Sequence, residues 1–156
     1  MRRRPAGGPF GLRVLMAVLL GLTGLVVATP YAAAGPCSWP GCAYSVNETD
    51  LWTAVLRNWC WPGETGDSKG YFLGCAQSGV SQDLSFLSPN GGHTPPSQAW
   101  NVLRVDAGWC YKVHFERYWS SSFTRIYDQR GRADLYVMVG NEAKAHIQGQ
   151  GYSSCP

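Results

Sequence analysis

The sequence predicts a mainly β fold, a small antiparallel sandwich or barrel with one short N-terminal helix and three disulfides. Three observations lead to this prediction. The first 34 residues are typical of a secretory signal peptide, six cysteines follow them, and apolar and polar residues alternate along the last third of the chain. The 122 residues that remain after the leader (35–156) are the length of one domain.

The leader has the three parts of an export signal. Arginines at positions 2–4 and 13 make a basic start, residues 14–28 are apolar, and residues 32–34 are alanines. The apolar run is shorter than the ~20 residues of a membrane-spanning helix, which argues against the alternative of a permanent anchor. We therefore expect cleavage before Gly35, a single secreted domain over 35–156, and no membrane contact afterwards.

The basic balance of the sequence belongs mostly to this leader. Four of the 13 Lys and Arg residues lie in it, and none of the ten Asp and Glu residues do. The mature chain is therefore close to neutral and contains no run of basic residues. Nucleic acid and anionic lipid are consequently not indicated as partners.

Six cysteines in an exported chain predict three disulfides and no free thiol. The spacing suggests Cys37–Cys42, Cys60–Cys75 and Cys110–Cys155, although sequence alone does not choose among the alternative pairings. A structural zinc site would need close pairs such as C-x2-C, and even the closest cysteines here are further apart. We therefore expect no metal and no cofactor.

One helix is predicted over residues 51–59. Leu51, Trp52, Val55, Leu56 and Trp59 recur at helical spacing and would form one apolar stripe. Asn47 or Thr49 could cap the start of this helix, and Pro62-Gly63 would end it.

A segment rich in Pro and Gly follows at residues 88–97, where we expect no regular element. It could divide a smaller N-terminal lobe from a strand-rich C-terminal one.

Strands are predicted after this segment. In residues 109–116 the odd positions are apolar and the even positions from 112 are polar, as in a strand with one buried face. Residues 100–105 and 123–127 are also predicted strands. Residues 135–139 and 143–147 flank Gly140-Asn141, which predicts a two-residue hairpin.

The mature chain is unusually aromatic, with all seven tryptophans. Trp52, Trp59, Trp109 and Phe115 lie on the faces predicted to be buried. Tryptophans in predicted loops could instead pack over disulfides, contact a partner protein or stack on a sugar ring. Taking them as contact residues, the predicted binding site comprises Trp39, Trp61, Tyr118 and Trp119.

No catalytic motif is evident. The chain lacks G-x-S-x-G, and His93, His114 and His146 show no metal-binding spacing. We therefore expect a non-enzymatic protein. One enzymatic alternative remains, because small secreted microbial ribonucleases use a Glu base, an Arg phosphate clamp and a His acid on a sheet that follows a helix. Glu116, Arg125 and His146 could supply those groups.

Two segments, DAGWCYKV at 106–113 and YDQRGRADLYV at 127–137, resemble small exported cysteine-rich proteins of actinomycetes. The resemblance covers about the last third of the chain and transfers no functional residue. It implies an extracellular binder, either a proteinase inhibitor or the adaptor that joins a lectin to a large toxin chain in umbrella-like particles. Our first expectation is therefore a secreted protein-binding domain. A carbohydrate-binding module is the first alternative and a ribonuclease the second.

Overall fold

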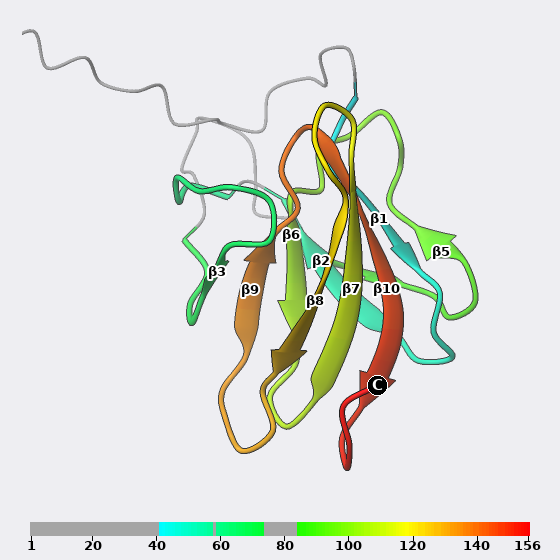
Figure 1. The fold of residues 1–156 in the computed structure, drawn as a ribbon, viewed down its shortest axis with the longest axis vertical. Helices are drawn as coiled ribbons and strands as arrows, with labels where there is room; N and C mark the ends of the chain where they lie inside the picture. Colours follow the sequence, from blue (N-terminus) through cyan, green and yellow to red (C-terminus); the bar gives the residue numbers. More distant parts are fainter. Residues whose placement is uncertain (1–40, 58, 74–83) are drawn as a thin grey trace, which may run out of the picture.

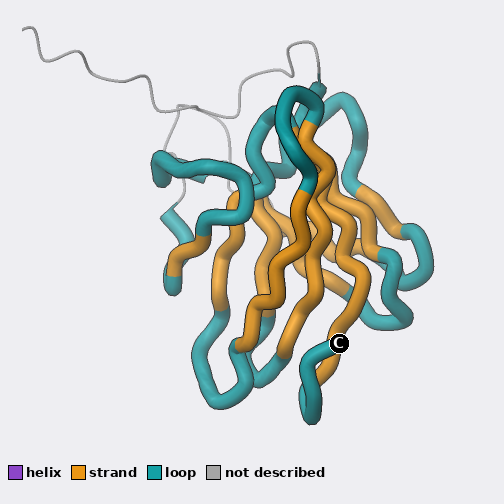
Figure 2. Tube along the Cα trace, viewed as in Figure 1, coloured by secondary structure: helices purple, strands orange, loops and turns teal. Residues whose placement is uncertain are grey.

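A computed structural model describes residues 41–57, 59–73 and 84–156 as a β-sandwich of two five-stranded sheets (Figure 1). The described residues contain strands and loops and no helix (Figure 2). Nothing in this part of the chain is therefore a helix able to cross a membrane. The strands are β1 (Tyr44–Asn47), β2 (Thr53–Leu56), β3 (Ser68–Lys69), β4 (Leu84–Leu87), β5 (Gly92–His93), β6 (Val102–Val105), β7 (Cys110–Arg117), β8 (Phe123–Asp128), β9 (Leu135–Met138) and β10 (Ala143–Gly151).

Sheet A has the strand order β5-β1-β10-β7-β8, and sheet B has the order β3-β9-β6-β2-β4. All neighbouring strands are antiparallel except β1 and β10, which run parallel. Each sheet combines strands from both sides of residues 88–97. These residues therefore do not separate two lobes, and they contain the short strand β5, where no element was expected.

The main core lies between the two sheets. Along β7, Tyr111, Val113 and Phe115 are buried, whereas Lys112 and His114 are partly exposed on the outer face. This confirms the predicted strand and the buried face of residues 111–115, whereas Trp109, expected on the same face, precedes the strand and is only partly buried. The inner face of sheet B contributes Val55, Leu103, Val105 and Val137 to the same cluster.

A second, smaller cluster covers part of the outer face of sheet B. Leu56, Trp59 and Val102 are buried in it, and Trp61, Phe72, Tyr136 and Met138 pack against them. The loop residues after β2 therefore fold back over their own sheet, which buries this sheet on both faces near β2.

The helix predicted over residues 51–59 was wrong, because Thr53–Leu56 form β2. All four residues of this strand are buried, with Val55 in the main core and Leu56 in the second cluster. A short apolar run buried on both faces is easily mistaken for the apolar stripe of a helix. Asn47, expected as a helix cap, instead donates from Nδ2 to Leu51 O at 2.6 Å and to Ser88 O at 3.1 Å, and so braces the β1–β2 turn.

The predicted hairpin at Gly140-Asn141 was also wrong. β9 pairs with β6 and β3 in sheet B, whereas β10 pairs with β7 and β1 in sheet A. The chain therefore crosses between sheets at this point. Gly140 has φ of +77°, a conformation that glycine adopts readily. The sequence therefore indicated a turn correctly, although the two strands on either side of it do not pair.

The predicted disulfide Cys110–Cys155 is present and joins the start of β7 to the C-terminal tail. Cys42 and Cys60 are also disulfide-bonded, and no described cysteine is free. The expected pairs Cys37–Cys42 and Cys60–Cys75 each include a residue outside the described part of the chain, so they stay predictions.

Candidate functional site

The four residues of the predicted binding site have different surroundings. Trp39 lies outside the described residues. Trp61 is partly buried against the second cluster, where its ring meets Tyr71 edge-on at 5.2 Å and the Lys69 ammonium lies 5.3 Å from its centroid. These contacts are those of a packing residue.

Tyr118 and Trp119 lie just after β7, at the end of the sandwich where the β7–β8 and β9–β10 loops meet (Figure 1). Tyr118 is partly buried, with the Lys144 ammonium 5.6 Å from its ring centroid. Trp119 is 64% exposed and lines a hollow of about 420 Å³ together with Glu64, Arg117 and Glu142. The structure therefore places Trp119 on a mixed polar and apolar surface that a partner could reach.

A second exposed aromatic surface lies along β4, at the free edge of sheet B in the described residues. Phe86 is 53% exposed and Leu84 is 48% exposed, whereas Leu87 is buried in the core. The register pairs Leu84 with Leu56 and Phe86 with Ala54, so both exposed residues lie on the outer face. Trp52, 61% exposed, continues this surface just before β2. We call Trp52, Leu84 and Phe86 the β4 patch.

Sequence reasoning missed the β4 patch. Trp52 was expected in the core because the helical stripe included it, and the strand assignment removes that reason. Ser85 is the only polar residue of this strand, so the sequence shows no alternation that would indicate which face is covered.

Trp52 also has hollows on two sides. One, of about 300 Å³, is lined by Phe86, His93 and Trp100 among others. The other, of about 230 Å³, is lined by Leu51, Trp52, Asp106, Trp109, Tyr111 and Gln150.

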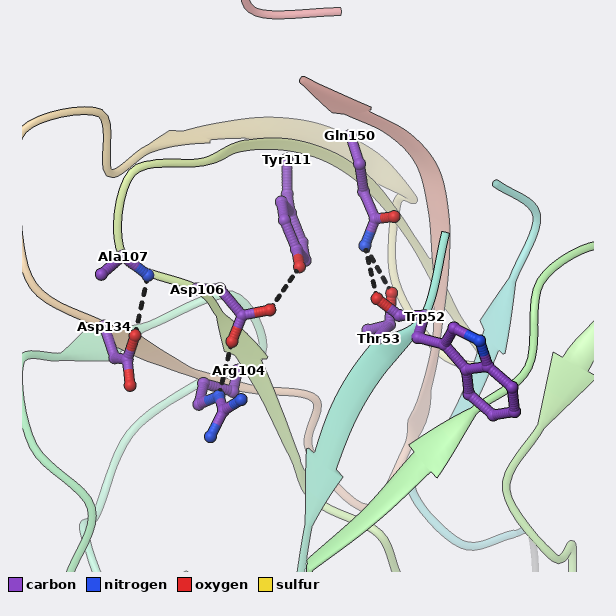
Figure 3. Close-up of polar contacts among 8 residues, drawn as sticks. All are labelled: Trp52, Thr53, Arg104, Asp106, Ala107, Tyr111, Asp134 and Gln150. Atoms are coloured by element: carbon purple, nitrogen blue, oxygen red, sulfur yellow. Dashed lines mark hydrogen bonds and ion pairs between the residues drawn. The ribbon is translucent and has the colours of Figure 1, made fainter. Parts of the chain in front are cut away.

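A polar network forms the wall of the second hollow (Figure 3). Asp106 accepts hydrogen bonds from Arg104 Nε at 2.7 Å and from the Tyr111 hydroxyl at 2.9 Å. Gln150 donates to Thr53 Oγ1 at 2.6 Å. Burial first, and then the Asp106 charge, raise the pKa of Tyr111 far above its usual range. The Tyr111 hydroxyl therefore remains a hydrogen-bond donor at any physiological pH.

The residues of the ribonuclease alternative do not assemble. Glu116 and His146 lie together on the outer face of sheet A, with 3.5 Å between Glu116 Oε2 and His146 Nε2. Arg125 pairs in register with the buried Val113 and therefore projects from the opposite face. There it donates to the Gly66 carbonyl at 2.8 Å. The expected phosphate clamp is thus separated from the expected acid and base by the sheet itself.

Comparisons of the chain with family models, with curated proteins and with solved structures found no match.

Proposed function

We propose that the chain is a secreted, non-enzymatic domain that binds an extracellular protein through the β4 patch. The observation that carries the proposal is the row of exposed apolar side chains along an edge strand. Edge strands of soluble proteins usually carry charged side chains or are covered by a helix or loop. Without such protection, an exposed apolar edge tends to pair with strands of other chains. Among the residues described, the β4 patch has neither.

The proposed binding mode is addition of an extended segment of the partner to β4. The partner's backbone would continue the sheet B hydrogen-bond ladder, and its outward side chains would pack beside Leu84 and Phe86. Trp52 would supply a large aromatic contact, the residue type most enriched among energetically dominant interface residues.

An adaptor role is favoured over a proteinase inhibitor. An inhibitor needs an exposed loop that projects into a protease cleft, and residues 88–97 are the long Pro- and Gly-rich segment that would have to do so. Instead, Asn90 and Gly91 donate their backbone N–H groups to Thr49 and Asn47 at 2.7 Å, and Thr94 donates to Ser45 at 3.0 Å. The segment is thus attached along β1 and the β1–β2 turn.

The proposal is tested by capture from culture fluid of the producing organism, with mass spectrometry of the bound chains. Phe86→Lys on β4 is compared with Ile126→Lys on β8, the edge strand of sheet A. The two residues are matched, with Ile126 52% exposed on the outer face of its sheet. We expect the wild type and Ile126→Lys to retain the same partner and Phe86→Lys to lose it. Recovery of the partner by both variants, or of no partner by the wild type, contradicts the proposal.

Carbohydrate binding is the second candidate, favoured by the hollow beside Trp52. Two indoles, Trp52 and Trp109, border a carboxylate and an amide there, and sugar rings stack on indoles while their hydroxyls bond to such groups. The discriminating variant is Trp109→Ala, because Trp109 lies outside the β4 patch. Retention of the wild type on an insoluble polysaccharide, reduced in Trp109→Ala and unchanged in Phe86→Lys, would favour this candidate over protein binding.

A further inference from the structure

Two histidines far apart in the sequence face each other on the outer surface of sheet A. His114 on β7 and His146 on β10 are directly paired in the antiparallel register, with their ring centroids 6.2 Å apart. Their strand neighbours Val113, Phe115, Ala145 and Ile147 are all buried, which fixes both histidines on the outer face. The position of the two rings is therefore set by the strands and not by a loop.

In each imidazole, Nδ1 lies within hydrogen-bond distance of a side-chain oxygen on a neighbouring strand or loop. His146 Nδ1 lies 2.6 Å from Glu48 Oε1, and a carboxylate can only accept, so Nδ1 carries the proton. His114 Nδ1 lies 3.0 Å from the Thr124 hydroxyl, which can accept in the same way. In the neutral rings, Nε2 of both histidines then carries a lone pair that a metal ion can accept, and at His146 the Glu116 carboxylate lies beside it. In zinc sites, the ring nitrogen of a histidine that does not bind the metal commonly donates its proton to a carboxylate, which fixes the orientation of the ring.

Glu116 supplies a third donor on the same face. Its Oε2 lies 3.5 Å from His146 Nε2, and it also lies 3.5 Å from the Lys144 ammonium. Two imidazoles and one carboxylate are a set that zinc uses in proteins, with a fourth position left for water.

We propose that His114, His146 and Glu116 form a surface site for a divalent transition metal such as zinc. Glu48 and Thr124 orient the two imidazoles, and the fourth position is open to water or to a partner's side chain. Binding requires the two Nε2 atoms and a Glu116 oxygen to converge to metal–ligand distances of about 2.0–2.2 Å while both Nδ1 contacts are kept. It also requires Glu116 to leave Lys144.

A tighter group elsewhere is not an alternative site. Among the described residues, Cys110, Asp128 and Cys155 have donor atoms within 4.8 Å of one another. Both sulfurs of that group are joined in a disulfide, so they offer no thiolate to a metal. The donor atoms of His114, His146 and Glu116 lie further apart than those of this group, but none of them is part of a disulfide.

The test is titration of the purified mature protein with zinc chloride by isothermal calorimetry, with cobalt as a spectroscopic probe. We expect one ion per chain for the wild type and loss of binding in the double variant His114→Gln/His146→Gln. His93→Gln is the matched control, since His93 is the third histidine and lies beside Tyr44 on β1. Glu48→Gln should weaken binding by roughly tenfold or more if it orients His146.

Circular dichroism of the metal-free proteins checks that each variant is folded. Should the double variant not fold, Glu116→Gln replaces it, with the visible cobalt spectrum reporting the change in ligand set. No binding by the wild type, equal binding by the ligand variants, or equal loss in His93→Gln would overturn the proposal. The β4 patch lies on sheet B, so either proposal can fail without the other.

Discussion

At the scale of single residues, Tyr127 shows how a buried polar group connects the two sheets. Its hydroxyl donates to the Gly66 carbonyl at 2.8 Å, and its ring meets Phe115 edge-on in the core. Arg125 donates to the same carbonyl at 2.8 Å. Gly66 in turn donates to Met138 of β9 at 2.8 Å. One carbonyl therefore joins β8 of sheet A to the loop that precedes β3 of sheet B.

Tyr127→Phe should lower the free energy of unfolding by about 1 kcal/mol, the usual net value of one such hydrogen bond. It should also change the response to alkali. Burial raises the pKa of Tyr127 to about 12, so the native state holds this proton more tightly than the unfolded chain does. The resulting stabilisation is complete below pH 10 and is lost as the pH rises towards about 12.

Urea unfolding between pH 7 and 11 measures both effects. The variant should lose less stability than the wild type above pH 10, although Tyr111 keeps part of the pH dependence in both proteins. Tyr152→Phe is the control, since Tyr152 is exposed. If Tyr127→Phe and wild type follow parallel curves across this range, the assigned effect of burial is wrong.

At the scale of elements, β7 and β10 were the most predictable strands, because apolar residues on a buried face alternate with polar residues along both. Alternation alone places β7 and its buried residues, and the ranges predicted for β6, β8, β9 and β10 match these strands to within a few residues. β2 was not predictable in this way, since both of its faces are covered and no alternation remains. Which sheet each strand joins depends on contacts between distant segments, so the false hairpin at Gly140 could not be recognised locally.

The crossing between sheets at Gly140 gives a prediction at this scale. Gly140 has φ of +77°, and an added Cβ would clash with Thr65 Oγ1, which donates to the Val139 carbonyl at 3.0 Å. Gly140→Ala should therefore cost the strain of a left-handed residue, about 1–2 kcal/mol, and weaken that hydrogen bond. Gly131 has φ of +70° with open space around it, so Gly131→Ala should cost the strain alone.

Thermal unfolding of the two glycine variants separates these contributions. The midpoint should fall further for Gly140→Ala than for Gly131→Ala. Equal shifts would mean that Thr65 moves aside without cost, and that the contact does not help to fix the crossing.

At the scale of the whole molecule, the disulfide Cys110–Cys155 anchors the C-terminal tail to β7 across a sequence separation of 45 residues. Closing a loop of that size is worth about 4 kcal/mol in the chain-entropy model. The bond thus holds β10 in register with β7, and β10 carries His146 and pairs with β1. Both the proposed metal site and the order of strands in sheet A depend on this register.

The candidate surfaces were only partly predictable at this scale. Trp119 was expected to be accessible because it lies in a loop, and the structure places it beside a hollow. Trp61 was selected by the same reasoning but packs on the outer face of sheet B. The β4 patch and the histidine pair are produced by strand pairing between distant segments. Composition and spacing therefore carry no signal for either.

Addition of a partner strand to β4 is tested by hydrogen–deuterium exchange of the protein alone and in its captured complex. Backbone amides that join a new hydrogen-bond ladder exchange more slowly. We expect added protection at residues 84–87 in the complex, with residues 123–128 of β8, an edge strand of sheet A, unchanged. Protection confined to residues 117–122 and 139–142, around Trp119, with β4 unaffected, would contradict strand addition and move the interface to the end of the sandwich where the β7–β8 and β9–β10 loops meet.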